Sequence, residues 1–122
     1  MLQRGTTFKV ADNSGAKAFK LIGMPGHSRI RFVGVGDVVN VAVRGASSTG
    51  VVKDHTVVKV LIVRTRKETR RKDGSYVRFD DNAGVVIGND GNMLGTRVFG
   101  PVAREIRDMG YLKIASLAKE VW

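Results

Sequence analysis

Residue types that commonly carry catalysis or bind metals are scarce and scattered in this sequence. Its two histidines, His27 and His55, each lie in a polar stretch with no carboxylate or serine arranged to make it a general base. Asp80 and Asp81 are adjacent, and adjacent strand residues point to opposite faces, which disfavours a shared metal ion. There is no cysteine, which excludes disulfides, thiolate nucleophiles and zinc ribbons. We therefore expect no catalytic residue, no metal and no cofactor.

Two glycine-containing nucleotide-binding patterns are incomplete. Residues 34–39 (GVGDVV) begin like a dinucleotide fingerprint, but the third glycine is missing and the pattern that follows is that of a strand. No Gly-Lys-Ser/Thr occurs, so a P-loop is absent. These observations favour a protein that is not an enzyme.

The net charge is strongly positive. Lys and Arg number 21 against 11 Asp and Glu, a formal charge of +10. Such an excess repels itself in the free protein and fits a polyanionic partner, whose condensed counterions the cations displace. Solubility alone explains the excess poorly, because acidic residues serve that purpose better. No apolar run approaches the roughly 20 residues of a membrane span, so we expect no membrane partner.

A third of the basic residues fall in one short segment. Between positions 64 and 78 lie Arg64, Arg66, Lys67, Arg70, Arg71, Lys72 and Arg78, against only Glu68 and Asp73. A charge run is usually a solvated face, but here it ends an apolar strand and would form the tip of a rigid ribbon. Further cations lie in or beside expected loops, namely Lys17, Arg29, Arg31 and Arg44. We predict that these eleven residues bind RNA.

The rest of the pattern predicts a mostly β protein. Valine-rich runs predict strands at 8–10, 18–24, 38–43, 57–63, 75–79 and 83–87, with turn residues between them. We expect 57–63 and 75–79 to pair as a hairpin that bends near Asp73-Gly74. Short strands at such spacing indicate a small barrel.

The C-terminal region changes to helical spacing. Pro101 suits a first helical position, Val102, Ile106 and Met109 recur at helical intervals, and Gly110 ends the segment. Residues 111–118 predict a second short helix. We expect one domain over 1–122, with a barrel at 1–99, its basic hairpin at about 64–78, and a helical tail at 100–122.

The aromatic residues bear on how RNA would be recognised. Five phenylalanines are expected to be core or half-buried, which leaves few rings for base stacking: Phe8, Phe19, Phe32, Phe79 and Phe99. Residues 72–79 partly mimic the RNA-recognition-motif octamer, but its second and third positions differ. The sequence therefore favours backbone and shape recognition of structured RNA. A free single-strand-binding barrel or translation factor, and an RNA-processing enzyme, are the alternatives.

Six segments, in unbroken order and covering more than half of the chain, resemble a known family. They are 10–17 (VADNSGAK), 33–39 (VGVGDVV), 57–65 (VVKVLIVRT), 70–87 (RRKDGSYVRFDDNAGVVI), 95–107 (GTRVFGPVAREIR) and 111–121 (YLKIASLAKEV). The chain is similar to the fourteenth protein of the large ribosomal subunit, in its bacterial or organellar form.

That resemblance implies a closed five-stranded β-barrel with a projecting β-hairpin and short C-terminal α-helices. It implies a structural, non-enzymatic role in the large subunit: binding large-subunit rRNA, forming intersubunit bridges with small-subunit rRNA, and neighbouring other large-subunit ribosomal proteins. A ribosome-silencing factor docks on this family, and motif matching assigns that surface to Thr96, Arg97 and Lys113.

The chain departs from the family pattern at three positions. Glu68 stands where the family usually has glycine, and Lys72 and Lys119 stand where bacterial relatives usually have proline. Glu68 could alter the turn and local charge, and Lys72 could add a phosphate contact. Both a bacterial cytoplasmic ribosome and an organellar one, for example in the mitochondrial matrix, remain open.

Overall fold

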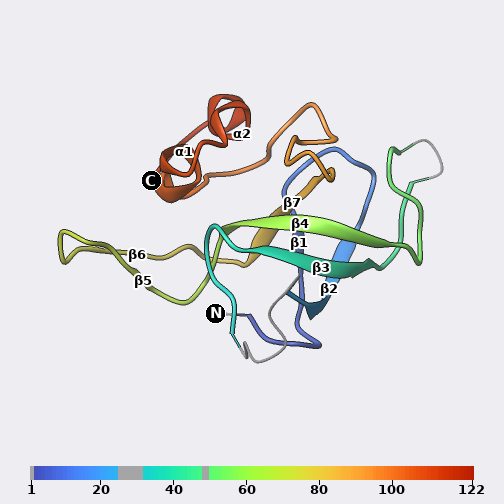
Figure 1. Cartoon of the computed structure of the whole chain (residues 1–122), viewed down its shortest axis with the longest axis horizontal. Helices are drawn as coiled ribbons and strands as arrows, with labels where there is room; N and C mark the ends of the chain where they lie inside the picture. The colour runs from blue at the N-terminus through green and yellow to red at the C-terminus, as the bar shows by residue number, and fades with distance from the viewer. Residues whose placement is uncertain (1, 25–31, 48–49) are drawn as a thin grey trace.

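Five strands close into a barrel in the computed structural model, which describes residues 2–24, 32–47 and 50–122. The strands are β1 (Thr7–Val10), β2 (Ala18–Gly23), β3 (Val38–Val43), β4 (Val57–Arg64) and β7 (Ala83–Ile87). They pair in the order β1-β2-β3-β4-β7 (Figure 1). All of these pairs are antiparallel except β1 with β7, which is parallel and closes the barrel. The predicted mostly β fold and closed barrel are confirmed.

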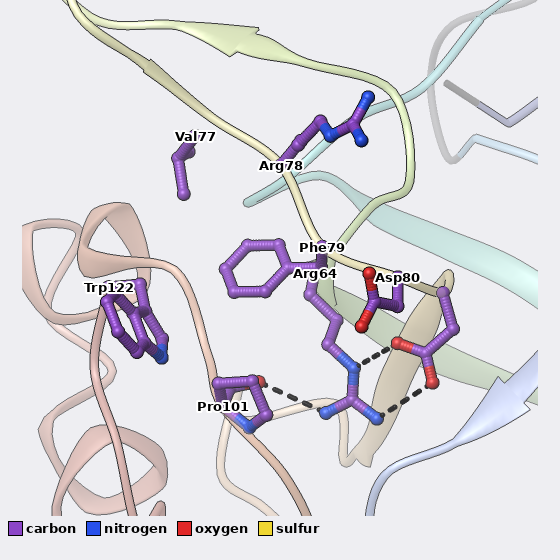
Figure 2. Close-up of a pocket in the computed structure, with 8 residues that line it drawn as sticks. Arg64, Val77, Arg78, Phe79, Asp80, Pro101 and Trp122 are labelled. Atoms are coloured by element: carbon purple, nitrogen blue, oxygen red, sulfur yellow. Dashed lines mark hydrogen bonds and ion pairs between the residues drawn. The ribbon is translucent and has the colours of Figure 1, made fainter.

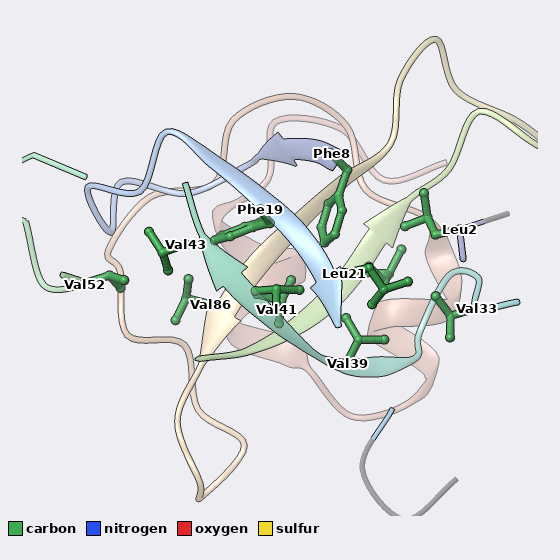
Figure 3. Close-up of a cluster of buried hydrophobic side chains, with 12 residues drawn as sticks. Leu2, Phe8, Phe19, Leu21, Val33, Val39, Val41, Val43, Val52 and Val86 are labelled. Carbon is green, nitrogen blue, oxygen red and sulfur yellow. The ribbon is translucent and has the colours of Figure 1, made fainter. Parts of the chain in front are cut away.

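The barrel interior is filled with aliphatic side chains and two phenylalanines. Along β3, Val39, Val41 and Val43 are fully buried while their neighbours are half-exposed, which is the period-two pattern of a strand with one core face. The rings of Phe8 and Phe19 lie beside them with centroids 5.4 Å apart (Figure 3). β-branched valine suits this tightly curved, pleated surface, and this explains the valine-rich runs.

From Val60 onward, β4 is buried on both faces. Val60 and Ile62 point into the barrel, whereas Leu61 and Val63 belong to a second cluster outside it. Two short helices cover that cluster and each adds one buried residue to it: α1 (Arg104–Asp108) adds Ile106, and α2 (Leu112–Leu117) adds Ile114. The uninterrupted apolar run at 60–63 therefore reflects a strand segment covered on both sides, whereas Val57 at the start of β4 is exposed.

The basic hairpin is a separate two-stranded sheet that projects from the barrel (Figure 1). Its strands are β5 (Thr69–Arg70) and β6 (Tyr76–Val77). The prediction that 75–79 pairs with 57–63 is wrong, because the edges of β4 are already paired with β3 and β7. The predicted bend is confirmed: Gly74 has φ +88°, and the Asp73 carboxylate accepts hydrogen bonds from the Ser75 backbone and hydroxyl.

Two further expectations need correction. Pro101 lies outside α1, since Ala103 is the residue that precedes the helix. Phe32 and Phe99 are 55% and 51% exposed rather than core or half-buried. Each stands in a loop beside a valine that takes the inward position, because adjacent side chains in extended chain alternate sides: Val33 and Val98 are buried instead. Phe79 is half-buried, as expected.

Close packing at Gly84 gives a test of the barrel. A Cβ there would lie 2.4 Å from a Val60 methyl and 3.0 Å from the Phe8 ring. Gly84→Ala should therefore lower the free energy of unfolding by about 1–3 kcal/mol through overpacking. Gly34→Ala is the matched control, because nothing lies within 4 Å of its added Cβ. Equal denaturation midpoints for the two variants would contradict the described barrel packing.

Candidate nucleic-acid interface

Arg64, at the end of β4, is an internal anchor. Its side chain is 9% exposed, and its Nε and Nη2 groups donate to the two carboxylate oxygens of Asp81 at 2.6 and 3.3 Å (Figure 2). Its Nη1 donates to the backbone oxygens of Phe99 and Pro101 at 2.8 and 3.0 Å. We predicted an RNA contact for Arg64, but the structure places its guanidinium among protein acceptors.

The surroundings of this guanidinium are closely fitted. A Cβ at Gly100, which has φ +79°, would lie 2.6 Å from Nη1 of Arg64, so glycine satisfies both the space and the backbone conformation. Lys9 adds a second cation 3.6 Å from Asp81. The hydrogen bond from Arg64 holds the pKa of the Asp81 carboxyl below its ordinary value of 3.8. The base of the hairpin, the barrel and the start of the tail therefore meet at one ion pair.

Five of the predicted RNA contacts are exposed on or beside the hairpin. They are Arg66, Lys67, Arg70, Lys72 and Arg78. Within the described ranges, none of their charged groups forms an ion pair. Unpaired cations on a fixed ribbon are available to phosphates without first breaking an internal bond.

Arg71 differs from its neighbours on the hairpin. Its side chain is 15% exposed, and its Nε donates to Glu105 of α1 at 2.8 Å. Its Nη2 donates to the backbone oxygen of Trp122. Arg71 therefore ties the hairpin to the tail. The basic run in the sequence did not reveal this role, because it carries no sign of which cation meets an acid 34 residues later.

A second group of predicted contacts lies at the other end of the barrel. Lys17 precedes β2 and Arg44 follows β3, both are exposed, and their backbones are joined by the hydrogen bonds Lys17 N–H to Gly45 O and Arg44 N–H to Ala18 O. Figure 1 shows the loop after β3 at the end of the molecule opposite the hairpin. The candidate cations thus form two separated groups. Arg29 and Arg31, like His27, lie outside the described residues.

Two of the three predicted partner residues, Thr96 and Arg97, are held in place by Asn13. Its Oδ1 accepts hydrogen bonds from the backbone N–H groups of Thr96 and Arg97 at 2.7 and 3.1 Å, and its Nδ2 donates to the Thr96 hydroxyl at 2.8 Å. Thr96, Arg97 and Lys113 are all exposed, with Lys113 on α2. The turn at 12–15 thereby fixes a loop more than 80 residues away.

The departure at Glu68 is accommodated without strain. Among the described non-glycine residues only His55 has a positive φ, at 60°, so the backbone at Glu68 does not need glycine. Glu68 is exposed and belongs to neither β4 nor β5. The sequence suggested that glutamate at position 68 could alter the turn, but the backbone conformation there does not require such a change.

Chemistry-bearing side chains are dispersed in the described residues. No group of three or more His, Asp or Glu side chains within 2–24, 32–47 and 50–122 could hold a metal ion. His55 is 85% exposed in its side chain and faces only Asp54, at 3.5 Å. No helix in the same ranges is long and apolar enough to cross a membrane.

Fold and surface together define a class: a small basic β-barrel that presents a cationic hairpin, covered on one side by a short helical tail. The family comparison is more specific. The family model of ribosomal protein L14p/L23e matches residues 1–122, so the chain belongs to that family. It is thus a structural protein of the large ribosomal subunit, from a family that is not one of enzymes, and it associates with rRNA and ribosomal proteins.

The ion pair at the hairpin base gives a pH-dependent prediction. Asp81→Asn should lower the free energy of unfolding by about 1–3 kcal/mol at neutral pH, because it leaves a buried guanidinium short of its charged acceptor. Since the folded pKa of Asp81 is depressed, this contribution is complete above pH 3.8 and is lost as the pH falls through the lower folded value. Chemical denaturation of both proteins across this range measures it.

The adjacent residue provides the control. Asp80 is exposed and forms no ion pair with any described residue, so Asp80→Asn should change stability by less than about 0.5 kcal/mol. A loss for Asp80→Asn as large as for Asp81→Asn, or a difference that persists unchanged in acid, would refute the anchor role of the Arg64–Asp81 pair.

Proposed function

We propose that the protein binds large-subunit rRNA through two separated groups of cations, and so holds two RNA segments in a fixed relation. The first group is the hairpin set of Arg66, Lys67, Arg70, Lys72 and Arg78. The second is Lys17 and Arg44 at the opposite end. Arg29 and Arg31, which the sequence also predicts as RNA contacts, lie outside the described residues and are assigned to neither group. The barrel sets the distance between the groups, so the mechanism is electrostatic and geometric.

The observation that carries this proposal is the state of the hairpin cations. They are exposed and unpaired within the described chain, whereas Arg64 and Arg71, in the same segment, are engaged by Asp81 and Glu105. The two engaged arginines fix the hairpin at its base and along its side. The free ones can then displace counterions from a phosphate backbone with little loss of conformational entropy.

We extend the proposal to the partners that the family resemblance implies. A hairpin that projects from the barrel can reach RNA beyond the primary site, which supports a contact with small-subunit rRNA at an intersubunit bridge. The loop that Asn13 holds, with Thr96 and Arg97, and Lys113 on α2 are proposed as the surface for protein partners, including a silencing factor. The proposal applies to a bacterial or an organellar ribosome alike.

Charge reversal on the hairpin tests the RNA contact. Arg70→Glu with Lys72→Glu should weaken binding to deproteinised large-subunit rRNA and reduce the slope of log affinity against log salt by about 2, roughly one per lost phosphate contact. The fold should remain, because neither side chain is paired within the described residues. Arg71 is left unchanged, since its replacement would detach the hairpin from the tail.

Arg97→Glu with Lys113→Glu is the matched control, since it makes the same change in charge on the proposed protein-binding surface. It should leave the salt slope close to that of the unmodified protein and impair capture of a protein partner instead. Equal loss of RNA affinity and slope in both double variants would mean that net charge alone drives binding, contrary to the proposal.

A further inference from the structure

A cleft separates the hairpin from the tail and is open to solvent. It has a volume of about 420 Å³, within the ~300–1,000 Å³ range of small-molecule sites. Figure 2 shows the Phe79 ring and the Trp122 indole on opposite sides of the opening, with Pro101 between them at the floor and Val77 above. The lining thus combines apolar and aromatic side chains with four charged ones, Arg64, Arg78, Asp80 and Asp81.

Trp122 is held in place although it is 55% exposed. Its backbone N–H donates to Val102 O at 2.9 Å, its backbone oxygen accepts from Arg71, and its indole Nε1–H donates to a Glu120 carboxylate oxygen at 2.9 Å. An exposed aromatic ring usually retains side-chain freedom that binding must remove. Here two hydrogen bonds fix the backbone and one restrains the indole ring, which lowers the ordering cost of stacking on its face.

The opposite wall is fixed as well. The Phe79 N–H donates to Thr65 O at 3.0 Å, and the ring is half-buried. Val77 and Phe79 contribute apolar groups to the cleft, and Arg78 between them also lines it, with its guanidinium directed away from the Phe79 ring in Figure 2. The segment that continues from β6 therefore offers the cleft two apolar groups and one cation.

Charges around the cleft favour a neutral occupant. The Arg64 guanidinium at its edge is already matched by Asp81, and Asp80 adds a carboxylate with no ion-pair partner among the described residues. Arg78 also lines the cleft, so two cations balance two carboxylates and a phosphate inside would gain no net attraction, whereas phosphates outside would meet the other hairpin cations. The cleft therefore suits a flat, uncharged group that is attached to an anionic backbone outside it.

We propose that this cleft binds one unpaired RNA base, placed against Trp122 and Phe79, with its ribose-phosphate backbone passing along the hairpin cations. This inference rests on the proposed rRNA binding and deepens it by adding a stacking site to a phosphate-binding surface. Base stacking on aromatic side chains is a sequence-tolerant source of affinity that does not depend on salt as ion pairing does. An apolar side chain of a neighbouring protein is the competing occupant.

Trp122 is the only tryptophan in the chain, so its fluorescence reports on the cleft directly. The full-length protein is titrated with deproteinised large-subunit rRNA, with excitation at the red edge of the indole band and acrylamide as collisional quencher. We expect RNA binding to quench Trp122 and to protect it from acrylamide. This measurement uses the unmodified protein and does not depend on the folding of any variant.

Substitutions separate stacking from charge. Trp122→Ala should weaken rRNA binding roughly 5- to 150-fold with the salt slope unchanged, whereas Trp122→Phe should retain most of the affinity. Phe99→Ala is the matched control, because Phe99 is similarly exposed, at 51%, and does not line the cleft. It should bind rRNA like the unmodified protein, and circular dichroism confirms that each variant is folded.

The outcomes distinguish this inference from the function on which it rests. If rRNA binding depends on salt but acrylamide still quenches Trp122 in the complex, the base site is wrong and the proposed rRNA binding is unaffected. Protection of Trp122 only in whole subunits, and not in the complex with rRNA alone, also overturns it and assigns the cleft to a protein side chain. Absence of salt-dependent rRNA binding overturns both proposals.

Discussion

The hydrogen bonds of the Arg64 guanidinium fix the barrel, the hairpin and the C-terminal tail relative to one another. This guanidinium joins Asp81, just before β7, to the backbone at Phe99 and Pro101, where the chain leaves the barrel for the tail. A buried arginine needs such acceptors, because an unmatched charge away from water is costly. Their presence turns the end of β4 into the fixed base from which the hairpin projects.

The basic residues at positions 64–78 therefore have two different roles. Arg64 fixes the hairpin to the barrel, and Arg71 fixes it to α1 and Trp122, so both act inside the protein. The cations between and beyond them are left free of ion pairs in the described chain. Binding strength would then depend on where the free cations are held as much as on the charge of +10. The same two arginines also shape the cleft: Arg64 lines it, and Arg71 donates a hydrogen bond to the backbone of Trp122, which lines it too.

The sequence predicted the barrel strands well and the details at their ends poorly. Valine-rich runs at 38–43 and 57–63 carry a strong strand pattern, and β3 and β4 match them within a residue. The two-residue strands β5 and β6 have no such periodicity, so their pairing was assigned to the wrong partner. The charge of Arg64 did not distinguish it from the other cations of the segment. Its position at the end of an apolar strand was the signal that could have predicted its burial. Phe32 and Phe99 were misplaced because hydrophobicity alone does not say which of two adjacent loop residues turns inward.

We predict that Arg64 holds the hairpin in position and does not neutralise phosphate, and one measurement tests this directly. The slope of log affinity for large-subunit rRNA against log salt is compared between the unmodified protein and folded Arg64→Gln, at a temperature where both are native. We predict the same slope, together with a lower free energy of unfolding for the variant. A slope reduced by about 1, with stability unchanged, would show that Arg64 contacts RNA phosphate and would contradict the account.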